Sequence, residues 1–139
     1  MTIKEIQEEI IEDFDMFDDW MQRYEFIIEN GKELPKIEEN KKSEDNLIKG
    51  CQSKVWLHAD YENGKLRFSA DSDAILTKGI ISLLLKVYNE QTPDDILQTD
   101  PFFIDEIGLK EHLSPTRANG LLSMVKQIKL LALAYKSKN

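Results

Sequence analysis

The chain has 139 residues, of which 41% are hydrophobic, and it carries a formal net charge of −8 at pH 7. This length suits one ordinary domain with one core, so we expect a single domain over residues 1–139 rather than a disordered chain. The 26 acidic side chains outnumber the 18 basic ones, and such a balance repels a phosphate backbone. A nucleic-acid partner is therefore not expected.

The sequence contains one cysteine and two histidines. This excludes an internal disulfide and, within a single chain, a thiolate-rich zinc or iron–sulfur site, so no metal is expected. The first residues are acidic and do not resemble a signal peptide. The most apolar stretches, residues 80–85 and 130–135, are far shorter than the ~20 residues of a membrane span. We expect a cytoplasmic protein without a membrane partner.

Charge is unevenly distributed along the chain. Residues 1–45 carry 15 acidic and 6 basic side chains, for a net charge of −9, whereas residues 110–139 carry 1 and 6, for a net charge of +5. Such polarity can steer a partner or draw the two ends of the fold together. The simpler interpretation is a set of amphipathic helices with solvated charged faces.

Two helices are predicted in the N-terminal third. Thr2 and Glu5 have the spacing of a capping box, and apolar residues recur at helical intervals behind them to about Phe17. An aspartate at position 18 or 19 can cap a second helix, and Gly31 suits a left-handed residue at its end.

A β-hairpin is predicted over about residues 55–70. Apolar residues alternate with polar ones over residues 55–61, as in a half-buried strand. Asn63-Gly64 suits a tight turn that needs positive φ, and Leu66, Phe68 and Ala70 continue the alternation beyond it.

Three further helices are predicted after the hairpin. Ser72 or Asp73 can cap a helix over residues 74–89, in which Gly79 indicates a close packing contact. Thr92-Pro93 and Ser114-Pro115 each begin another helix, because they combine a capping side chain with proline in the first turn. The order of helices, hairpin and helices predicts an α+β domain with a small antiparallel sheet.

Cys51 is the residue most suited to chemistry. A lone cysteine is most often a small buried hydrophobe, but Gly50, Gln52 and Ser53 around it are typical of a loop that a partner can approach. Lys49 and Lys54 are near in sequence and could favour the thiolate.

A cysteine hydrolase is an alternative that needs a histidine within reach of Cys51. His58 lies too far along the predicted strand unless the loop folds back, whereas His112 is available as a base. The simpler interpretation of His112 is a partly exposed residue near a helix end. The sequence shows no serine-nucleophile, phosphate-binding, dinucleotide-binding or zinc-protease motif, so independent catalysis is not expected.

The sequence resembles the SufE family of sulfur acceptors for cysteine desulfurases, which includes CsdE-like proteins. The resemblance covers almost the whole chain, and no motif position departs from it. Its blocks are Trp20, Arg23-Tyr24, Gly31, Leu34-Pro35, Gly50-Cys51-Gln52-Ser53, Val55-Trp56, Asp71-Ser72-Asp73-Ala74, Lys78-Gly79, Thr92-Pro93, Leu113-Ser114-Pro115-Thr116-Arg117 and Gly120.

The resemblance implies a fold similar to the iron–sulfur scaffold proteins of the IscU type. In that fold the sheet has a third strand, for which Leu47-Ile48 or the segment after Leu34 is the candidate. For Asp71 and Asp73 we expect helix capping rather than a docking role. The two tryptophans and Tyr24 are expected in the core rather than at an interface.

The resemblance also implies a role for Cys51 as nucleophile and persulfide carrier. The sulfur would come from a desulfurase of the SufS or CsdA type, which holds the pyridoxal phosphate, so this chain needs no cofactor of its own. The destination would be iron–sulfur cluster assembly on a SufBCD-type scaffold. Arg117 is the candidate for stabilising the thiolate or persulfide, with pairing to a nearby carboxylate as the alternative.

Three other functions remain as hypotheses. The first is an adaptor that activates a desulfurase allosterically without carrying sulfur. The second is the cysteine hydrolase, and the third is a cluster-binding scaffold, for which one thiolate per chain leaves most iron positions to other molecules. Self-association of the chain is a further possibility that the sequence allows.

Overall fold

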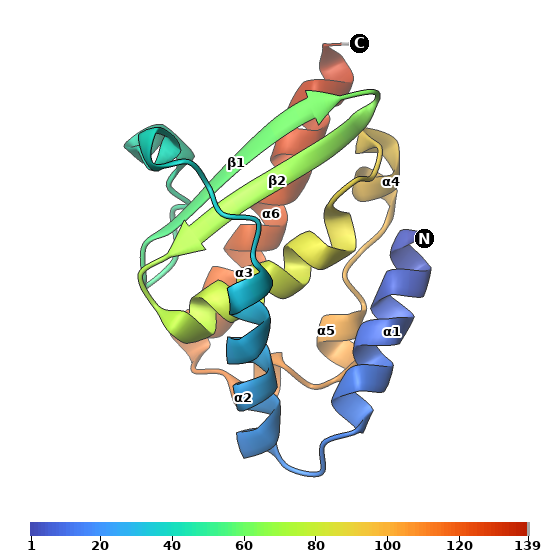
Figure 1. The fold of residues 1–139 in the computed structure, drawn as a ribbon, viewed down its shortest axis with the longest axis vertical. Helices are drawn as coiled ribbons and strands as arrows, with labels where there is room; N and C mark the ends of the chain where they lie inside the picture. Colours follow the sequence, from blue (N-terminus) through green and yellow to red (C-terminus); the bar gives the residue numbers. More distant parts are fainter. Residues whose placement is uncertain (139) are drawn as a thin grey trace.

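The computed structural model describes residues 1–138. It is an α+β domain in which a β-hairpin packs against helices (Figure 1). Within the described residues no helix is both long and apolar enough to cross a membrane. The elements in chain order are α1 (Ile3–Asp15), α2 (Trp20–Asn30), β1 (Val55–Glu62), β2 (Lys65–Ser72), α3 (Ile75–Tyr88), α4 (Pro93–Gln98), α5 (Phe103–Glu106) and α6 (Pro115–Ser137), with short 3₁₀ turns between some of them.

The two N-terminal helices begin as predicted. The Thr2 side chain accepts a hydrogen bond from the Glu5 N–H at 3.1 Å, and the Glu5 carboxylate accepts one from the Thr2 N–H at 3.0 Å, which confirms the capping box. Asp19 caps α2 by accepting from the Gln22 N–H at 2.8 Å. The prediction for Gly31 was wrong, because its φ of −60° is right-handed and the chain continues into a 3₁₀ turn.

The hairpin is confirmed, but its third strand is not formed among residues 1–138. Asn63 and Gly64 take the positive φ values of 54° and 78° that the tight turn needs. Leu47 and Lys36 each make one isolated bridge, to opposite edges of the hairpin. Pro35 has no N–H to donate beside Lys36, and a 3₁₀ turn ends immediately before Leu47. Neither segment therefore extends its pairing into a strand.

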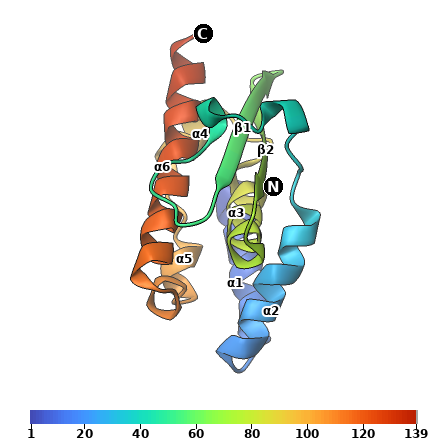
Figure 2. The ribbon, with the colours of Figure 1, turned by 90° about the vertical axis from the view of Figure 1, so that its left-hand side faces the viewer.

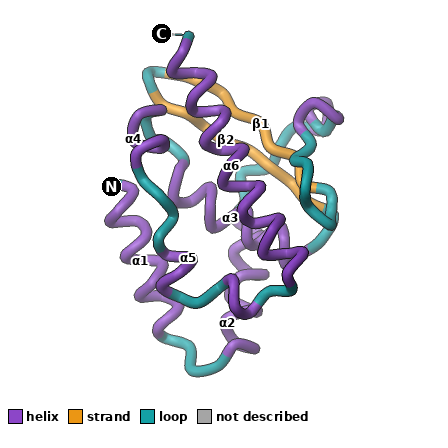
Figure 3. The backbone as a smooth tube through the Cα atoms, turned by 180° about the vertical axis from the view of Figure 1, so that it is seen from behind, coloured by secondary structure: helices purple, strands orange, loops and turns teal. Residues whose placement is uncertain are grey.

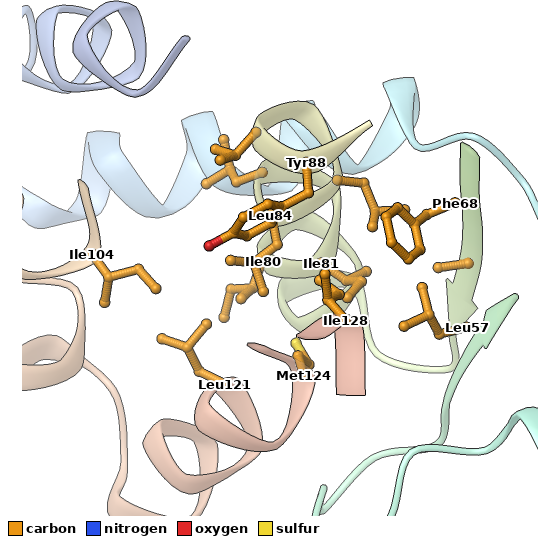
Figure 4. Close-up of a cluster of buried hydrophobic side chains, with 14 of the residues drawn as sticks. Leu57, Phe68, Ile80, Ile81, Leu84, Tyr88, Ile104, Leu121, Met124 and Ile128 are labelled. Carbon is orange, nitrogen blue, oxygen red and sulfur yellow. The ribbon is translucent and has the colours of Figure 1, made fainter. Parts of the chain in front are cut away.

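α3 is the central helix of the domain. It lies between α2 and α6, as Figures 2 and 3 show from two sides. The apolar face of the hairpin covers it, and the core is filled by side chains from the hairpin, α3, α5 and α6 (Figure 4). The labelled members of this cluster are Leu57, Phe68, Ile80, Ile81, Leu84, Tyr88, Ile104, Leu121, Met124 and Ile128.

The close contact predicted at Gly79 joins α3 to α2. A Cβ atom on Gly79 would lie 2.1 Å from the carbonyl oxygen of Ile27. A Cβ atom on Gly31 would lie 3.2 Å from the backbone nitrogen of Gly79. Gly31 therefore allows close packing of the two segments rather than a left-handed turn.

The capping predicted for α3 was wrong. Its N-cap is Ala74, and the Ser72 hydroxyl accepts from the Ala74 N–H at 3.3 Å. The buried carboxylate of Asp71 instead pairs with Lys42 at 2.6 Å and Lys78 at 3.4 Å. The exposed carboxylate of Asp73 accepts a hydrogen bond from the Lys54 N–H at 3.1 Å. The remaining capping predictions hold, because Thr92 and Ser114 cap α4 and α6.

The aromatic residues expected in the core divide into two groups. Trp20 and Tyr24 are partly buried and pack against the core. Trp56 is also partly buried, but it lies on the outer face of the hairpin, where the Lys42 ammonium lies 5.5 Å from its ring centroid.

Candidate functional site

Cys51 lies on a short loop that is anchored where the chain enters the hairpin and where it leaves it. The Ile48 N–H donates to the Val55 carbonyl at 2.8 Å and closes the loop at its base. On the other side, the backbone of Lys54 exchanges hydrogen bonds with Asp73. The loop runs beside α6 before the chain enters β1 (Figure 2).

Gly50 allows the loop to approach α6. Its φ of +94° belongs to the left-handed region, and a Cβ atom there would lie 2.7 Å from the Ser123 hydroxyl oxygen. Both the backbone conformation and the contact therefore require glycine at this position. The next residue, Cys51, is thereby directed against the first turns of α6.

The Cys51 thiol is half-buried against Gly120. Its Sγ lies 3.6 Å from the Gly120 carbonyl oxygen, to which the thiol donates a weak hydrogen bond. A Cβ atom on Gly120 would lie 3.5 Å from Sγ, so glycine leaves free space beside the sulfur. That space is a cavity of about 10 Å³, which approaches the size that holds one water molecule. Its lining comes from the Cys51 loop, α3 and α6.

Burial raises the pKa of the Cys51 thiol, because desolvation disfavours the thiolate. The thiol is therefore protonated at neutral pH in this conformation. Lys49 and Lys54, which the sequence suggested as thiolate-stabilising residues, are both exposed, and neither lines the cavity.

Arg117 is exposed in the first turn of α6 and lines the same cavity as Cys51. The fold thus brings together two candidate residues that are far apart in the sequence. Thr77, Ile80 and Met124 also line this cavity, and no motif in the sequence marks them as site residues. The only available signal was helical periodicity, which places such residues on a buried face without distinguishing a core from a site.

Neither histidine lines the cavity around Cys51. The Nε2 atom of His58 lies 3.1 Å from the carboxylate of Asp60. The ring of His112 stacks on Trp20 with a centroid distance of 3.9 Å, and its Nδ1 lies 2.9 Å from the Gly108 carbonyl oxygen. Neither position favours the hydrolase hypothesis, which needs a base at the thiol.

The structure offers no cluster of three or more His, Cys, Asp or Glu side chains suited to a metal ion within residues 1–138. The reactive group that the site presents is the half-buried thiol of Cys51. A thiolate at this position can attack an electrophilic sulfur, and the cavity beside it can hold a small atom bound to Sγ.

Comparisons with known proteins identify the family of this chain. The family model described as "SufE: Fe-S metabolism associated domain" matches residues 8–132. An uncharacterized SufE-like protein of Rhizobium etli is 42% identical over 127 residues, which cover 88% of this chain and 86% of that protein. An uncharacterized SufE-like protein of Synechocystis is 39% identical over 126 residues, with coverage of 91% and 79%.

The fold is also found in a solved structure. The solution structure of a hypothetical protein from Thermus thermophilus matches with a TM-score of 0.79 and 22% identity, and the match covers 95% of this chain and 96% of that one. At this identity the likeness concerns the fold alone. Because the family model spans most of the sequence, the chain belongs to the SufE family, whose role lies in iron–sulfur metabolism.

Proposed function

We propose that this protein accepts sulfur from a cysteine desulfurase as a persulfide on Cys51 and delivers it for iron–sulfur cluster assembly. The observation that carries the proposal is the position of the only cysteine. It lies on an anchored loop, with its Sγ against the Gly120 carbonyl and beside a small cavity. Membership of the SufE family supports the same role.

The proposed reaction transfers one sulfur atom between two cysteines. The Cys51 thiolate attacks the outer sulfur of a persulfide on the desulfurase, and a bond forms between that sulfur and Sγ. The sulfur–sulfur bond on the desulfurase breaks, and its cysteine leaves as a thiolate. No external oxidant or reductant is needed, because the step is an exchange between sulfur atoms. Pyridoxal phosphate acts in the desulfurase, where the persulfide is first made.

Burial gives the site a resting state and a reactive state. In the resting state the pKa of Cys51 is raised by burial, and a protonated thiol is a poor nucleophile and resists oxidation. Attack on the persulfide requires the thiolate, so docking must lower the pKa of Cys51, which a move of the thiol out of its half-buried position would do. After transfer, the cavity of about 10 Å³ can shelter the added sulfur from water and oxidants.

Arg117 is the proposed second residue of this site. Its guanidinium, which stays charged at any physiological pH, can favour the Cys51 thiolate or persulfide anion from the shared cavity. In an Arg117→Ala variant we expect a higher pKa of Cys51, measured by the pH dependence of alkylation. An unchanged pKa, together with an unchanged rate of sulfur transfer, would remove Arg117 from the mechanism.

The decisive experiment is the intact mass of the protein after incubation with a SufS- or CsdA-type desulfurase, pyridoxal phosphate and free cysteine. We expect a gain of whole sulfur atoms that a reductant reverses. The matched control is Cys51→Ser, which should keep the fold and gain no sulfur. No gain in the wild-type protein with an active, bound desulfurase would contradict the carrier role. If Cys51→Ser also stimulated the desulfurase fully, the protein would be an allosteric adaptor.

The downstream step has its own test. Persulfide-loaded protein should transfer its labelled sulfur to a SufBCD-type scaffold, and the unloaded Cys51→Ser variant should transfer none. Retention of all label on Cys51 in the presence of the scaffold would contradict delivery to that acceptor.

A further inference from the structure

A groove of about 480 Å³ runs beside Cys51, between residues 44–49 and residues 123–130 of α6. We refer to it as the α6 groove. Figure 2 shows the chain passing from η3 (Glu44–Asn46) along α6 toward the start of β1. The groove adjoins the Cys51 loop through Ser123, whose hydroxyl faces Gly50. One end of this groove therefore lies next to the Cys51 loop.

The charged residues of the groove differ between its two ends. Lys49 lies next to Gly50, and Lys126 lies about one helical turn beyond Ser123, so both lysines are near Cys51. Glu44 and Asp45 lie at the other end, in the η3 turn. These four side chains form no ion pair with any residue in the described part of the chain. Their charges are thus available to a ligand.

Apolar surface lies next to these charges. Leu130, which lines the groove, is 48% exposed, and Leu133, one turn further along α6, is 49% exposed. Leu130 lies about 10 Å beyond Ser123 along the helix axis. The groove therefore has a basic end near Cys51, whereas the exposed leucine of α6 and the acidic η3 turn line it farther from Cys51. Exposed leucines beside unpaired charges are typical of a surface that binds another protein.

We propose that the α6 groove binds a segment of the sulfur-donating protein whose charges run in the opposite order. This segment carries an acidic side chain at the end nearest Cys51, and apolar and basic side chains at the far end. The inference rests on the proposed function, because the donor must bring its persulfide to Cys51. Contacts beside the reacting thiol orient the two sulfur atoms for attack.

Charge complementarity favours this occupant over a second copy of the chain. A second copy offers two strongly charged regions, residues 1–45 with a net charge of −9 and residues 110–139 with a net charge of +5. The first would place negative charge against Glu44 and Asp45, and the second would place positive charge against Lys49 and Lys126, so each region is repelled by one end of the groove. A segment with both signs in the right order avoids this repulsion.

Three charge reversals test the proposal. We would measure the Kd for the desulfurase with the full-length protein carrying Lys126→Glu, Asp45→Lys or the control Lys65→Glu. Lys65 is exposed at the tip of the hairpin and forms no ion pair within residues 1–138. We expect Lys126→Glu and Asp45→Lys each to raise the Kd about tenfold, with Lys65→Glu within about twofold of wild type.

Each alternative has a distinct outcome. Tighter binding by Asp45→Lys would mean a uniformly acidic partner segment and would overturn the proposed charge order. An unchanged Kd for Lys126→Glu would place the groove outside the interface. A wild-type dimer that Lys126→Glu dissociates, measured by light scattering, would identify a second copy as the occupant.

The mass measurement separates this proposal from the carrier role. At saturating desulfurase, Lys126→Glu should gain as much sulfur as wild type, because Lys126 does not line the Cys51 cavity. If wild type itself gained no sulfur, the carrier role would fail whatever the groove variants showed. If wild type gained sulfur and all Kd values were equal, only the groove proposal would fail.

Discussion

Two glycine contacts, one at the core and one at the site, show how this fold uses close packing for different purposes. At Gly79, α3 approaches α2 so closely that a Cβ atom would lie 2.1 Å from a backbone oxygen. At Gly120, α6 approaches Cys51, but a Cβ atom would lie 3.5 Å from Sγ, an ordinary contact distance. The first contact leaves no room, as in other close-packed cores. The second leaves a small cavity beside the sulfur of Cys51, which the proposed persulfide would occupy.

The largest expected effect is on stability, in Gly79→Ala. The new methyl group would overlap the Ile27 carbonyl, so α2 and α3 must separate, and we expect a loss of about 3 kcal/mol in the free energy of unfolding. Urea denaturation measures it. Gly120→Ala is the matched control, since it makes the same chemical change inside a helix. A cost below about 1 kcal/mol for Gly79→Ala would contradict the close contact.

A smaller effect is expected for Gly50→Ala, at the loop that carries Cys51. A side chain at φ +94° is strained, and its Cβ would meet the Ser123 hydroxyl, so we expect a cost of about 1–2 kcal/mol. Adding Ser123→Ala should recover part of this cost, because it removes the oxygen but leaves the backbone strain. We also expect faster alkylation of Cys51, since the loop would move away from α6. If Gly50→Ala had the stability and the alkylation rate of wild type, neither the positive φ nor the contact with Ser123 would constrain this position.

Gly120→Ala should change function more than stability. Alanine favours a helix by up to about 1 kcal/mol over glycine, which can offset the new contact with Sγ, so we expect the stability to stay within about 1 kcal/mol of wild type. The methyl group would fill space beside the sulfur, and the persulfide should then be reduced faster by dithiothreitol. An unchanged persulfide lifetime would mean that the cavity does not shelter the added sulfur.

The smallest expected effect is the pH dependence contributed by Cys51. Because burial raises the pKa of its thiol in the folded state, folding favours the protonated form. This contribution is complete below the ordinary thiol pKa of about 8.5 and is lost as the pH rises through the higher folded-state value. Above about pH 8.5, the unfolding free energy of wild type should therefore fall relative to that of Cys51→Ser. A constant difference between pH 7 and 10 would show that the thiol titrates normally.

Local patterns predicted most of the elements because their causes are local. The Thr2 capping box, the Asn63-Gly64 turn and the proline-started helices each depend on residues a few positions apart. The predictions that failed depended on distant residues. Gly31 has its role because Gly79 lies against it, and Asp71 pairs with Lys42 and Lys78 instead of capping α3.

The sequence by itself determined the α+β class, the hairpin and the family resemblance, and it predicted Cys51 as the site residue. Only the tertiary structure decided the state of that thiol. Cys51 and Gly120 are 69 residues apart and meet because α6 packs beside the loop. That contact buries the sulfur, reverses the pKa direction suggested by the neighbouring lysines, and places Arg117 at the same cavity. Solvation depends on everything that surrounds a group in space, so no local pattern could supply it.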